Sequence, residues 1–227
     1  MISKLGWGSR TRAAQWVRDG RVRVNGRLIR DPDLPVRQGL DRIDIDGRQP
    51  EPATRTVLML NKPRGLVTST RDEQGRATVY ACLEDAALPW LAPIGRLDKA
   101  SEGLLLFGND PAWAARVIDP DSGPPKTYHV QIDRLADASL LRNLESGVAV
   151  RGRRLSVRSV RTLRTGAKNA WLEIVLDEGR NRHIRRLLEA LDVSVLRLIR
   201  VAIGPLALGD LAKGQWRMLT PREIDSL

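Results

Sequence analysis

The sequence predicts an α+β protein with a small basic N-terminal domain and a larger domain built on a mainly antiparallel sheet flanked by helices. Three observations lead to this fold class. Several segments alternate apolar and polar residues at strand spacing, other segments have helical spacing, and the two kinds do not alternate regularly as they do in parallel βαβ proteins. With 227 residues, the chain is long enough to form a small domain and a larger one.

The N-terminal domain is expected to begin with a short helix over residues 9–19, SRTRAAQWVRD. Its apolar side chains recur at helical spacing, and Ser9 is a natural N-cap. Residues 21–29 then alternate valine with arginine, which is typical of a strand. Asn25-Gly26 is the dipeptide most typical of a tight hairpin turn, so this segment is expected to fold as a β-ribbon.

A change of composition marks the boundary between the two domains. Residues 41–47 alternate again at strand spacing and complete the ribbon. Residues 49–55 contain two prolines and show no periodicity, which is typical of a linker. We therefore expect a domain over residues 1–48, a linker over 49–55 and a second domain over 56–227.

The second domain mixes both periodicities along its length. Helices are expected over residues 77–83, 111–118 and 181–192. Strands are expected over residues 56–63, 103–109, 126–133, 169–177 and 195–204.

The charge balance indicates an anionic partner. Lysine and arginine number 38 against 27 acidic residues, which gives a formal net charge of +11. Residues 1–30 alone contain eight lysines and arginines and a single acid, Asp19. Nucleic acid is the usual partner of such a surface, whereas membrane lipid is less favoured because no long basic amphipathic helix is present.

Composition also excludes several other classes. No stretch reaches the roughly 20 apolar residues of a membrane helix, and the first residues lack the apolar core of a signal peptide, so a cytoplasmic location is expected. A single cysteine, Cys82, rules out an internal disulfide and a cysteine-based metal site. His129 and His183 have no further ligand at metal-binding spacing, so no metal is expected.

The stretch GRLDKASEGLLLFGND, residues 95–110, places Asp98 directly before an apolar run. One interpretation is an aspartate that opens a loop and bonds its own backbone. The other is a catalytic carboxylate, which attacks a substrate and needs a nearby cation to stay charged in a dry pocket.

Two further segments carry candidate partners for that acid. In EGRNRHIRRLLEAL, residues 178–191, an apolar helical stripe leaves Arg182 and Arg186 on the opposite side, where they can face phosphates or simply solvent. Arg185 lies at the flank of the stripe, where it can reach a carboxylate in a cleft. In the strand KTYHV, Tyr128 is either a core residue or a ring that stacks on an everted base.

Taken together, these motifs resemble the RsuA-type pseudouridine synthases, which modify ribosomal RNA and carry an N-terminal S4 domain. GRLDKASEGLLLFGND resembles the central motif of that family, KTYHV resembles its Lys-x-Tyr segment, and residues 178–219 resemble its third motif and C-terminal tail. SRTRAAQWVRDGRVRVNGRLI is similar to an S4 RNA-binding domain. The resemblance covers nearly the whole chain.

The resemblance implies roles for individual residues. Asp98 would be the catalytic carboxylate, Tyr128 would pack on the target uracil, and Arg185 would pair with Asp98. Two positions depart from the family pattern, because Phe107-Gly108 stands where a threonine is often found and His183 stands where glutamine is common. The side chains expected to hold RNA are Arg10, Arg12, Arg21, Arg23, Arg27, Arg96, Lys126, Arg182 and Arg186.

The implied reaction is the isomerisation of specific uridines in ribosomal RNA to pseudouridine, with no cofactor. The bond between uracil N1 and ribose C1′ breaks, the base turns over, and the base rejoins the sugar through C5. Such a reaction needs an everted nucleotide and a pocket closed to water around a charged Asp98. The expected partners are ribosomal RNA and its assembly intermediates, and the protein is expected to act as a monomer.

Two alternatives remain at this point. A non-catalytic S4-type RNA-binding or ribosome-assembly protein would share the basic N-terminal domain. A glycosidase or nucleosidase would also use Asp98, but such enzymes usually need a second carboxylate. Glu102 is near in sequence but is expected to lie in a loop.

Overall fold

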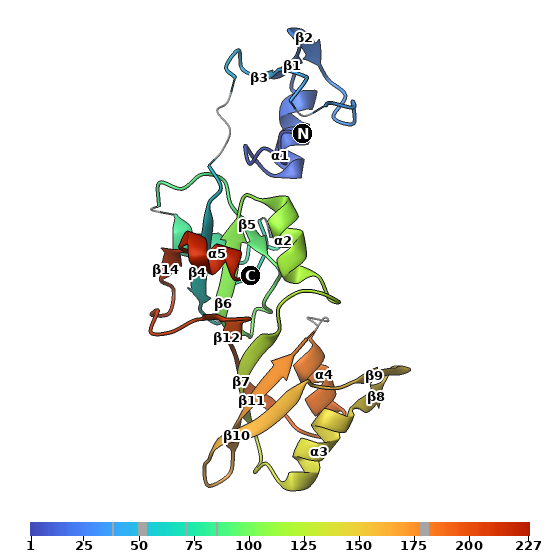
Figure 1. Cartoon of the computed structure of the whole chain (residues 1–227), viewed down its shortest axis with the longest axis vertical. Coiled ribbons are helices and arrows are strands. Elements are labelled where there is room, and N and C mark those ends of the chain that lie inside the picture. Colours follow the sequence, from blue (N-terminus) through green and yellow to red (C-terminus); the bar gives the residue numbers. More distant parts are fainter. Residues whose placement is uncertain (38, 50–53, 71, 85, 178–181) are drawn as a thin grey trace.

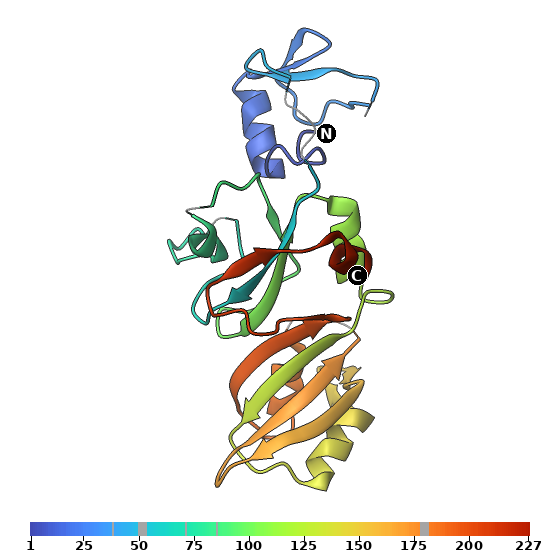
Figure 2. The same cartoon turned by 60° about the vertical axis from the view of Figure 1, so that its left-hand side comes forward.

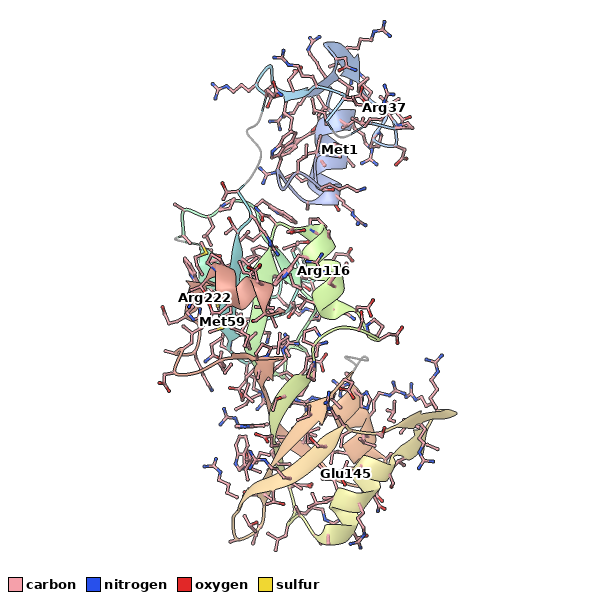
Figure 3. All side chains as sticks on the ribbon, viewed as in Figure 1. Met1, Arg37, Met59, Arg116, Glu145 and Arg222 are labelled. Atoms are coloured by element: carbon pink, nitrogen blue, oxygen red, sulfur yellow. The ribbon has the colours of Figure 1, made fainter. Side chains whose placement is uncertain are left out.

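The computed structural model describes residues 1–37, 39–49, 54–70, 72–84, 86–177 and 182–227. Figures 1 and 2 show an elongated molecule with the N-terminal elements gathered at one end and the large sheet running through the rest. In Figure 3, Met1 and Arg37 are labelled in the N-terminal domain, and Glu145 is labelled on the part of the molecule at the opposite end. In the described part of the chain, no helix combines the length and the apolar character needed to cross a membrane.

The N-terminal domain is a helix packed on a three-stranded antiparallel ribbon, as the sequence predicts. Helix α1 (Arg10–Arg18) starts at Ser9, whose hydroxyl accepts a hydrogen bond from the Arg12 amide. The ribbon has the order β2-β1-β3, and both residues of the Asn25-Gly26 turn have positive φ, as a tight hairpin turn requires. The three strands are β1 (Val22–Val24), β2 (Arg27–Ile29) and β3 (Ile43–Ile45).

The second domain is built on a nine-stranded sheet with the main order β10-β11-β7-β12-β6-β4-β14. Every pairing in it is antiparallel except the short parallel contact between β12 and β6. The expectation of a mainly antiparallel sheet is therefore confirmed. The strands are β4 (Val57–Lys62), β5 (Ala92–Ile94), β6 (Glu102–Gly108), β7 (Lys126–Ile132), β10 (Ser159–Thr165), β11 (Ala170–Leu176), β12 (Val195–Ile203), β13 (Leu206–Ala207) and β14 (Trp216–Met218).

Helices cover this sheet in two separate groups. Helices α3 (Ala138–Ser146) and α4 (His183–Glu189) pack on one face, together with the hairpin of β8 (Val148–Val150) and β9 (Arg153–Leu155). Helices α2 (Pro111–Ile118) and α5 (Pro221–Asp225) pack on the other face of β4 and β6. Because both faces of β4 and β6 are covered, these strands are buried at every residue, whereas β7 alternates between buried and half-buried side chains.

Of the three helices predicted in the second domain, one forms as expected and two differ from the structure. Residues 111–118 form α2 as predicted. Residues 77–83 form only a 3₁₀ turn, η1 (Val79–Leu83), and the helix expected over 181–192 is the shorter α4. Helix α4 begins only at His183 because Arg182 has a left-handed backbone with φ of 51°, so Arg182 cannot belong to a right-handed helix.

Gly103 allows β6 and β12 to approach each other at the start of their parallel contact. Its φ is +100°, and a Cβ atom there would lie 2.2 Å from the carbonyl oxygen of Arg200. The register pairs Gly103 with Arg200 and Glu102 with Ile199. Beyond this point the two strands are no longer paired, and the candidate site lies beside this contact.

Candidate active site

Asp98 lies in the loop that joins β5 to β6, and neighbouring backbone groups fix that loop. The Ser101 amide donates to the carbonyl oxygen of Asp98 over 2.9 Å, which closes a turn around the acid. The Thr68 hydroxyl donates to the Leu97 carbonyl over 2.7 Å, and the Gly65 amide donates to the Lys99 carbonyl over 2.8 Å. The residues after β4 thus hold the loop from one side.

Lys62, the last residue of β4, supports the same loop from inside the protein. Its ammonium donates to the carbonyl oxygens of Ser101 over 2.8 Å, Pro63 over 3.0 Å and Asp98 over 3.2 Å. The residue is fully buried, and burial lowers its pKa from 10.5 to about 8 against the opposing attraction of Asp98 and Glu102. Three carbonyl acceptors therefore compensate part of the cost of burying this charge.

A cavity of about 530 Å³ opens beside this loop, within the range of small-molecule sites. It collects side chains from the β5–β6 loop, β7, the start of α4 and β12. The predicted residues that line it are Arg96, Asp98, Lys126, Tyr128, Arg182 and Arg185. Segments far apart in the sequence thus contribute to one site.

The remaining predicted RNA-binding residues lie elsewhere. Arg186, on α4, is half-buried and does not line the cavity. The N-terminal arginines are all exposed, and Arg12 and Arg21 both lie over the ring of Trp16, at 5.2 and 5.6 Å from its centroid. The other exposed N-terminal positions of the prediction are Arg10, Arg23 and Arg27.

The cations nearest Asp98 are not arranged as the helical wheel predicts. Within the described residues, Arg182 comes within 3.9 Å of the Asp98 carboxylate, whereas Arg185 forms no ion pair with it. Arg185 instead donates to the carbonyl oxygens of Ala100 over 3.2 Å and Val195 over 3.4 Å. Because Arg182 precedes α4 with a left-handed backbone, it points toward Asp98 and not away from the cavity. Residues 178–181 of the same motif lie outside the described residues.

Arg185 still responds electrostatically to Asp98. Burial and the nearby Arg182 lower the pKa of Arg185, while Asp98 opposes that shift. The Nε atom of Arg185 is buried and has no hydrogen-bond partner among the residues that the structure describes. The guanidinium therefore supports the Asp98 loop through Ala100 and keeps a donor unused.

The expected closed pocket is open on the side of the acid. The Asp98 side chain is 36% exposed, so solvent reaches it in the absence of a substrate. Tyr128 is only 8% exposed and forms an apolar wall with Ile184 and Leu198. The site thus combines one accessible carboxylate, an aromatic wall and flanking arginines.

Asp98 is the one acid among the described residues that line the cavity. Glu102 lies on the opposite face of the sheet, where its carboxylate binds Arg197 over 3.0 Å and Lys213 over 2.6 Å. Glu102 is part of β6 and not of a loop, which corrects the expectation from the sequence. Among the described lining residues, the cavity accordingly holds no second carboxylate of the kind that most glycosidases need. In the part of the chain that the structure describes, no cluster of three potential metal ligands occurs.

Known proteins resemble this chain in sequence and in fold. Residues 56–190 match the family model described as RNA pseudouridylate synthase, and residues 1–41 match the S4 domain model. The chain belongs to the RNA pseudouridylate synthase family. The resemblance to RsuA-type synthases and the two-part fold predicted from the sequence are thereby confirmed.

Relatives of this family match the chain over its full length. An RNA pseudouridine synthase of Aquifex aeolicus (strain VF5) is 34% identical over 227 residues, which cover 100% of this chain and 91% of the relative. The ribosomal large subunit pseudouridine synthase B of Bacillus subtilis (strain 168) is 31% identical over 229 residues, which cover 100% of this chain and 93% of the relative. A crystal structure of a pseudouridylate synthase superposes with a TM-score of 0.69 at 26% identity, over 99% of this chain and 96% of that one.

The two departures from the family pattern have structural partners in this chain. The ring of Phe107 is fully buried and meets Tyr80 edge to face, with ring centroids 5.6 Å apart. The Nε2 atom of His183 lies 2.9 Å from the carbonyl oxygen of Ser156. Both residues therefore pack within the fold of a pseudouridine synthase without displacing Asp98.

Sequence reasoning missed two buried cations of this site, Lys62 and Arg200. Arg200 is 5% exposed, lines the cavity and donates from Nε to the Leu104 carbonyl over 2.7 Å. Each cation interrupts an apolar run, in VLMLNKP and in VLRLIRVAIG, and a charge inside such a run is the signal that could have identified it.

Proposed function

We propose that the protein converts specific uridines of ribosomal RNA to pseudouridine, with Asp98 as the catalytic carboxylate. The observation that carries this proposal is the cavity in which Asp98 is the one described acid, flanked by Arg182 and Arg185 and walled by Tyr128. Relatives named as ribosomal large subunit pseudouridine synthases support ribosomal RNA as the substrate class.

The reaction is an isomerisation, so atoms balance without a co-reactant. The glycosidic bond from N1 to C1′ breaks, a new bond forms from C5 to C1′, C5 loses its proton and N1 gains one. Asp98 acts by attack on C1′, by attack on C6 of the ring or by removal of a sugar proton, and each route needs a carboxylate beside the ribose.

The other cavity residues would hold the everted uridine. The ring of Tyr128 offers a flat apolar surface against which uracil can pack. Arg185, which bonds the Ala100 carbonyl in the Asp98 loop, would keep that loop in place and attract the nucleotide. A bound nucleotide would cover the open side of the cavity and exclude water from the detached base.

The N-terminal domain would hold the RNA outside the cavity. We propose that residues 1–48 form this S4 domain, that residues 49–55 link it to the catalytic domain over 56–227, and that its exposed arginines contact phosphates. Arg96 and Arg186 would extend these contacts near the cavity. The protein would act as a monomer in the cytoplasm, on ribosomal RNA or on an assembly intermediate.

The proposal is tested on ribosomal RNA from cells that lack this protein. The full-length protein should create pseudouridine at one or a few positions, and Asp98→Asn should reduce the rate by at least about 10³-fold, since the carboxylate takes part in the chemistry. Asp210→Asn is the matched control, because Asp210 is exposed and does not line the cavity. Pseudouridine is mapped by chemical derivatisation and primer extension, and binding to the same RNA is measured in parallel.

Each alternative gives a different result in this experiment. A nucleosidase would release free uracil and leave an abasic position. A non-catalytic RNA-binding protein would bind the RNA equally well before and after the Asp98→Asn change and would create no pseudouridine. Either outcome overturns the proposal.

A further inference from the structure

Two buried cations line the cavity, far from Asp98 in the sequence and with no part in the chemistry described above. Lys126, on β7, is 7% exposed, and Arg200, on β12, is 5% exposed. Strand register pairs Arg200 with Tyr128, so both side chains leave the sheet on the cavity face. Lys126 lies two residues before Tyr128, or about 7 Å along the strand, and also points to this face.

Neither cation is neutralised by the protein. Among the described residues, no carboxylate forms an ion pair with Lys126 or Arg200, and Lys126 donates no hydrogen bond from its ammonium. In the described part of the chain, the buried Nη2 atom of Arg200 likewise has no hydrogen-bond partner. Asp119 and Asp177 attract Lys126 only from a distance.

The two cations also repel each other. Burial and the charge of Arg200 both lower the pKa of Lys126, because each makes the charged ammonium less favourable. Placing one unpaired cation in a protein interior is expensive, and placing two side by side adds repulsion. A single backbone bond, from Arg200 to the Leu104 carbonyl, does not offset these costs.

An anionic ligand in the cavity would remove both costs at once. Both side chains line the cavity, and the buried Nη2 donor of Arg200 has no hydrogen-bond partner among the described residues. Arginine and lysine are the usual partners of phosphate oxygens. Lys126 is about 7 Å along β7 from Tyr128, a spacing of the order of the distance from base to phosphate within one nucleotide.

We propose that Lys126 and Arg200 form a subsite for a phosphate that flanks the target uridine. The identity of the nucleotide rests on the proposed function, whereas the anion subsite rests on the two cations alone. Such a subsite would align the base against Tyr128 and would favour a uridine within an RNA chain over a free nucleoside.

The test compares the binding of uridine, uridine 5′-monophosphate and uridine 3′-monophosphate to the full-length protein at low ionic strength. At least one monophosphate should bind the wild-type protein about tenfold more tightly than uridine, because charge-assisted bonds to phosphate are strong. Lys126→Met and Arg200→Met should each lose most of that preference and keep the affinity for uridine. Arg197→Met is the matched control, since Arg197 is on the same strand as Arg200 but does not line the cavity.

The outcomes separate this proposal from the preceding one. The subsite is disproved if neither monophosphate binds the wild-type protein more tightly than uridine, or if Lys126→Met retains the full preference. Lys126→Met decides the question alone should Arg200→Met fail to fold, which urea unfolding would reveal. A phosphate preference without pseudouridine formation would support the subsite and refute the proposed function, and the reverse result would refute the subsite alone.

Discussion

The two faces of the large sheet differ in whether their cations are paired with an acid. On the face opposite the cavity, here called the outer face, Arg197 and Lys213 share the carboxylate of Glu102, whose side chain is only 3% exposed. On the cavity face, Lys126 and Arg200 are themselves buried, yet no described carboxylate pairs with either. Cations with an acid partner contribute to the fold, whereas cations kept without one reduce stability and are explained by a ligand.

The same contrast extends along the outer face. Glu173, on β11, accepts a hydrogen bond from Arg161 over 2.6 Å and lies 3.4 Å from His129. Trp171 lies between Arg164 and Arg197, whose guanidinium carbons are 4.9 and 5.6 Å from its ring centroid. Outer-face charges are thus compensated within the protein by acids or by an aromatic ring.

The largest effect on stability is expected at Gly103, where β6 and β12 approach each other closely. A Gly103→Ala change would place a Cβ atom 2.2 Å from the Arg200 carbonyl oxygen at a positive φ. We expect the free energy of unfolding to fall by more than about 4 kcal/mol, as measured by urea denaturation. Gly209→Ala is the matched control, because Gly209 also has positive φ but nothing lies within 4 Å of the added atom. Equal losses in both variants would show that the close approach is unimportant.

Removing the charge of Glu102 tests how much its ion pairs with Arg197 and Lys213 stabilise the protein. Burial would raise the pKa of Glu102, but hydrogen bonds from Arg197 and Lys213 outweigh it and hold the pKa below 4.5. Glu102→Gln should lower the free energy of unfolding at pH 7 by about 2 kcal/mol, whereas Glu173→Gln, with a more exposed side chain, should cost less than about 1 kcal/mol.

The pH dependence of this difference follows from the depressed pKa of Glu102. A carboxylate whose pKa is lower in the folded protein stabilises it above the unfolded pKa, and this contribution is lost as the pH falls through the folded value. The difference between wild type and Glu102→Gln should therefore shrink as the pH falls below about 4. A difference that stays constant down to pH 3 would contradict this assignment.

Lys62 is an intermediate case, a buried cation whose partners are neutral carbonyls. As the pH rises through about 8, the ammonium loses a proton and one of its three carbonyl acceptors loses its donor. Loss of one hydrogen bond that holds the Asp98 loop should raise the activation barrier. We therefore expect kcat on ribosomal RNA to fall by about tenfold.

Protein stability should move in the opposite direction over the same pH range. The unfolded chain holds the Lys62 proton up to about 10.5, so loss of this proton in the folded protein raises the free energy of unfolding between pH 8 and 10.5. A fall in kcat without loss of folded protein would support the role of Lys62. A flat rate profile up to pH 9.5 would refute it.

The smallest expected effect concerns Lys126 on the cavity face, and here the free energy of unfolding should change in the opposite direction. Lys126→Met should leave the free energy of unfolding unchanged or raise it by up to about 1 kcal/mol, because it removes a buried charge without breaking an ion pair. Arg197→Met should lower it by about 1 kcal/mol, because it breaks the bond to Glu102. Equal destabilisation by both changes would remove the distinction between the two faces.

Much of this fold follows from local sequence patterns. The Ser9 cap, the Asn25-Gly26 turn and the alternation in β7 each identify an element from a few neighbouring residues. Elements with weaker signals were not predicted, among them α3 and the β8–β9 hairpin. Helix α5 was missed although Thr220 and Glu223 form a capping box there.

The site was predictable only in part, because tertiary structure determines which cations approach Asp98 and which are buried. The motifs identify Asp98, Tyr128 and Arg185 through the family resemblance, and all three line the cavity. The approach of Arg182 to Asp98 depends on one left-handed residue that a helical wheel cannot represent. The burial of Arg200 depends on the pairing of β12 with two distant strands, which no local pattern contains.

The position of β12 in the sheet has a consequence for synthesis of the chain. This strand, which ends at Ile203, lies between β7 and β6, although both of those strands leave the ribosome much earlier. Until β12 has emerged, the two halves of the sheet have no common neighbour and the cavity cannot close around Asp98. A nascent chain would therefore acquire catalytic competence only after β12 has emerged, and a product that terminates before β12 would carry the acid without a site.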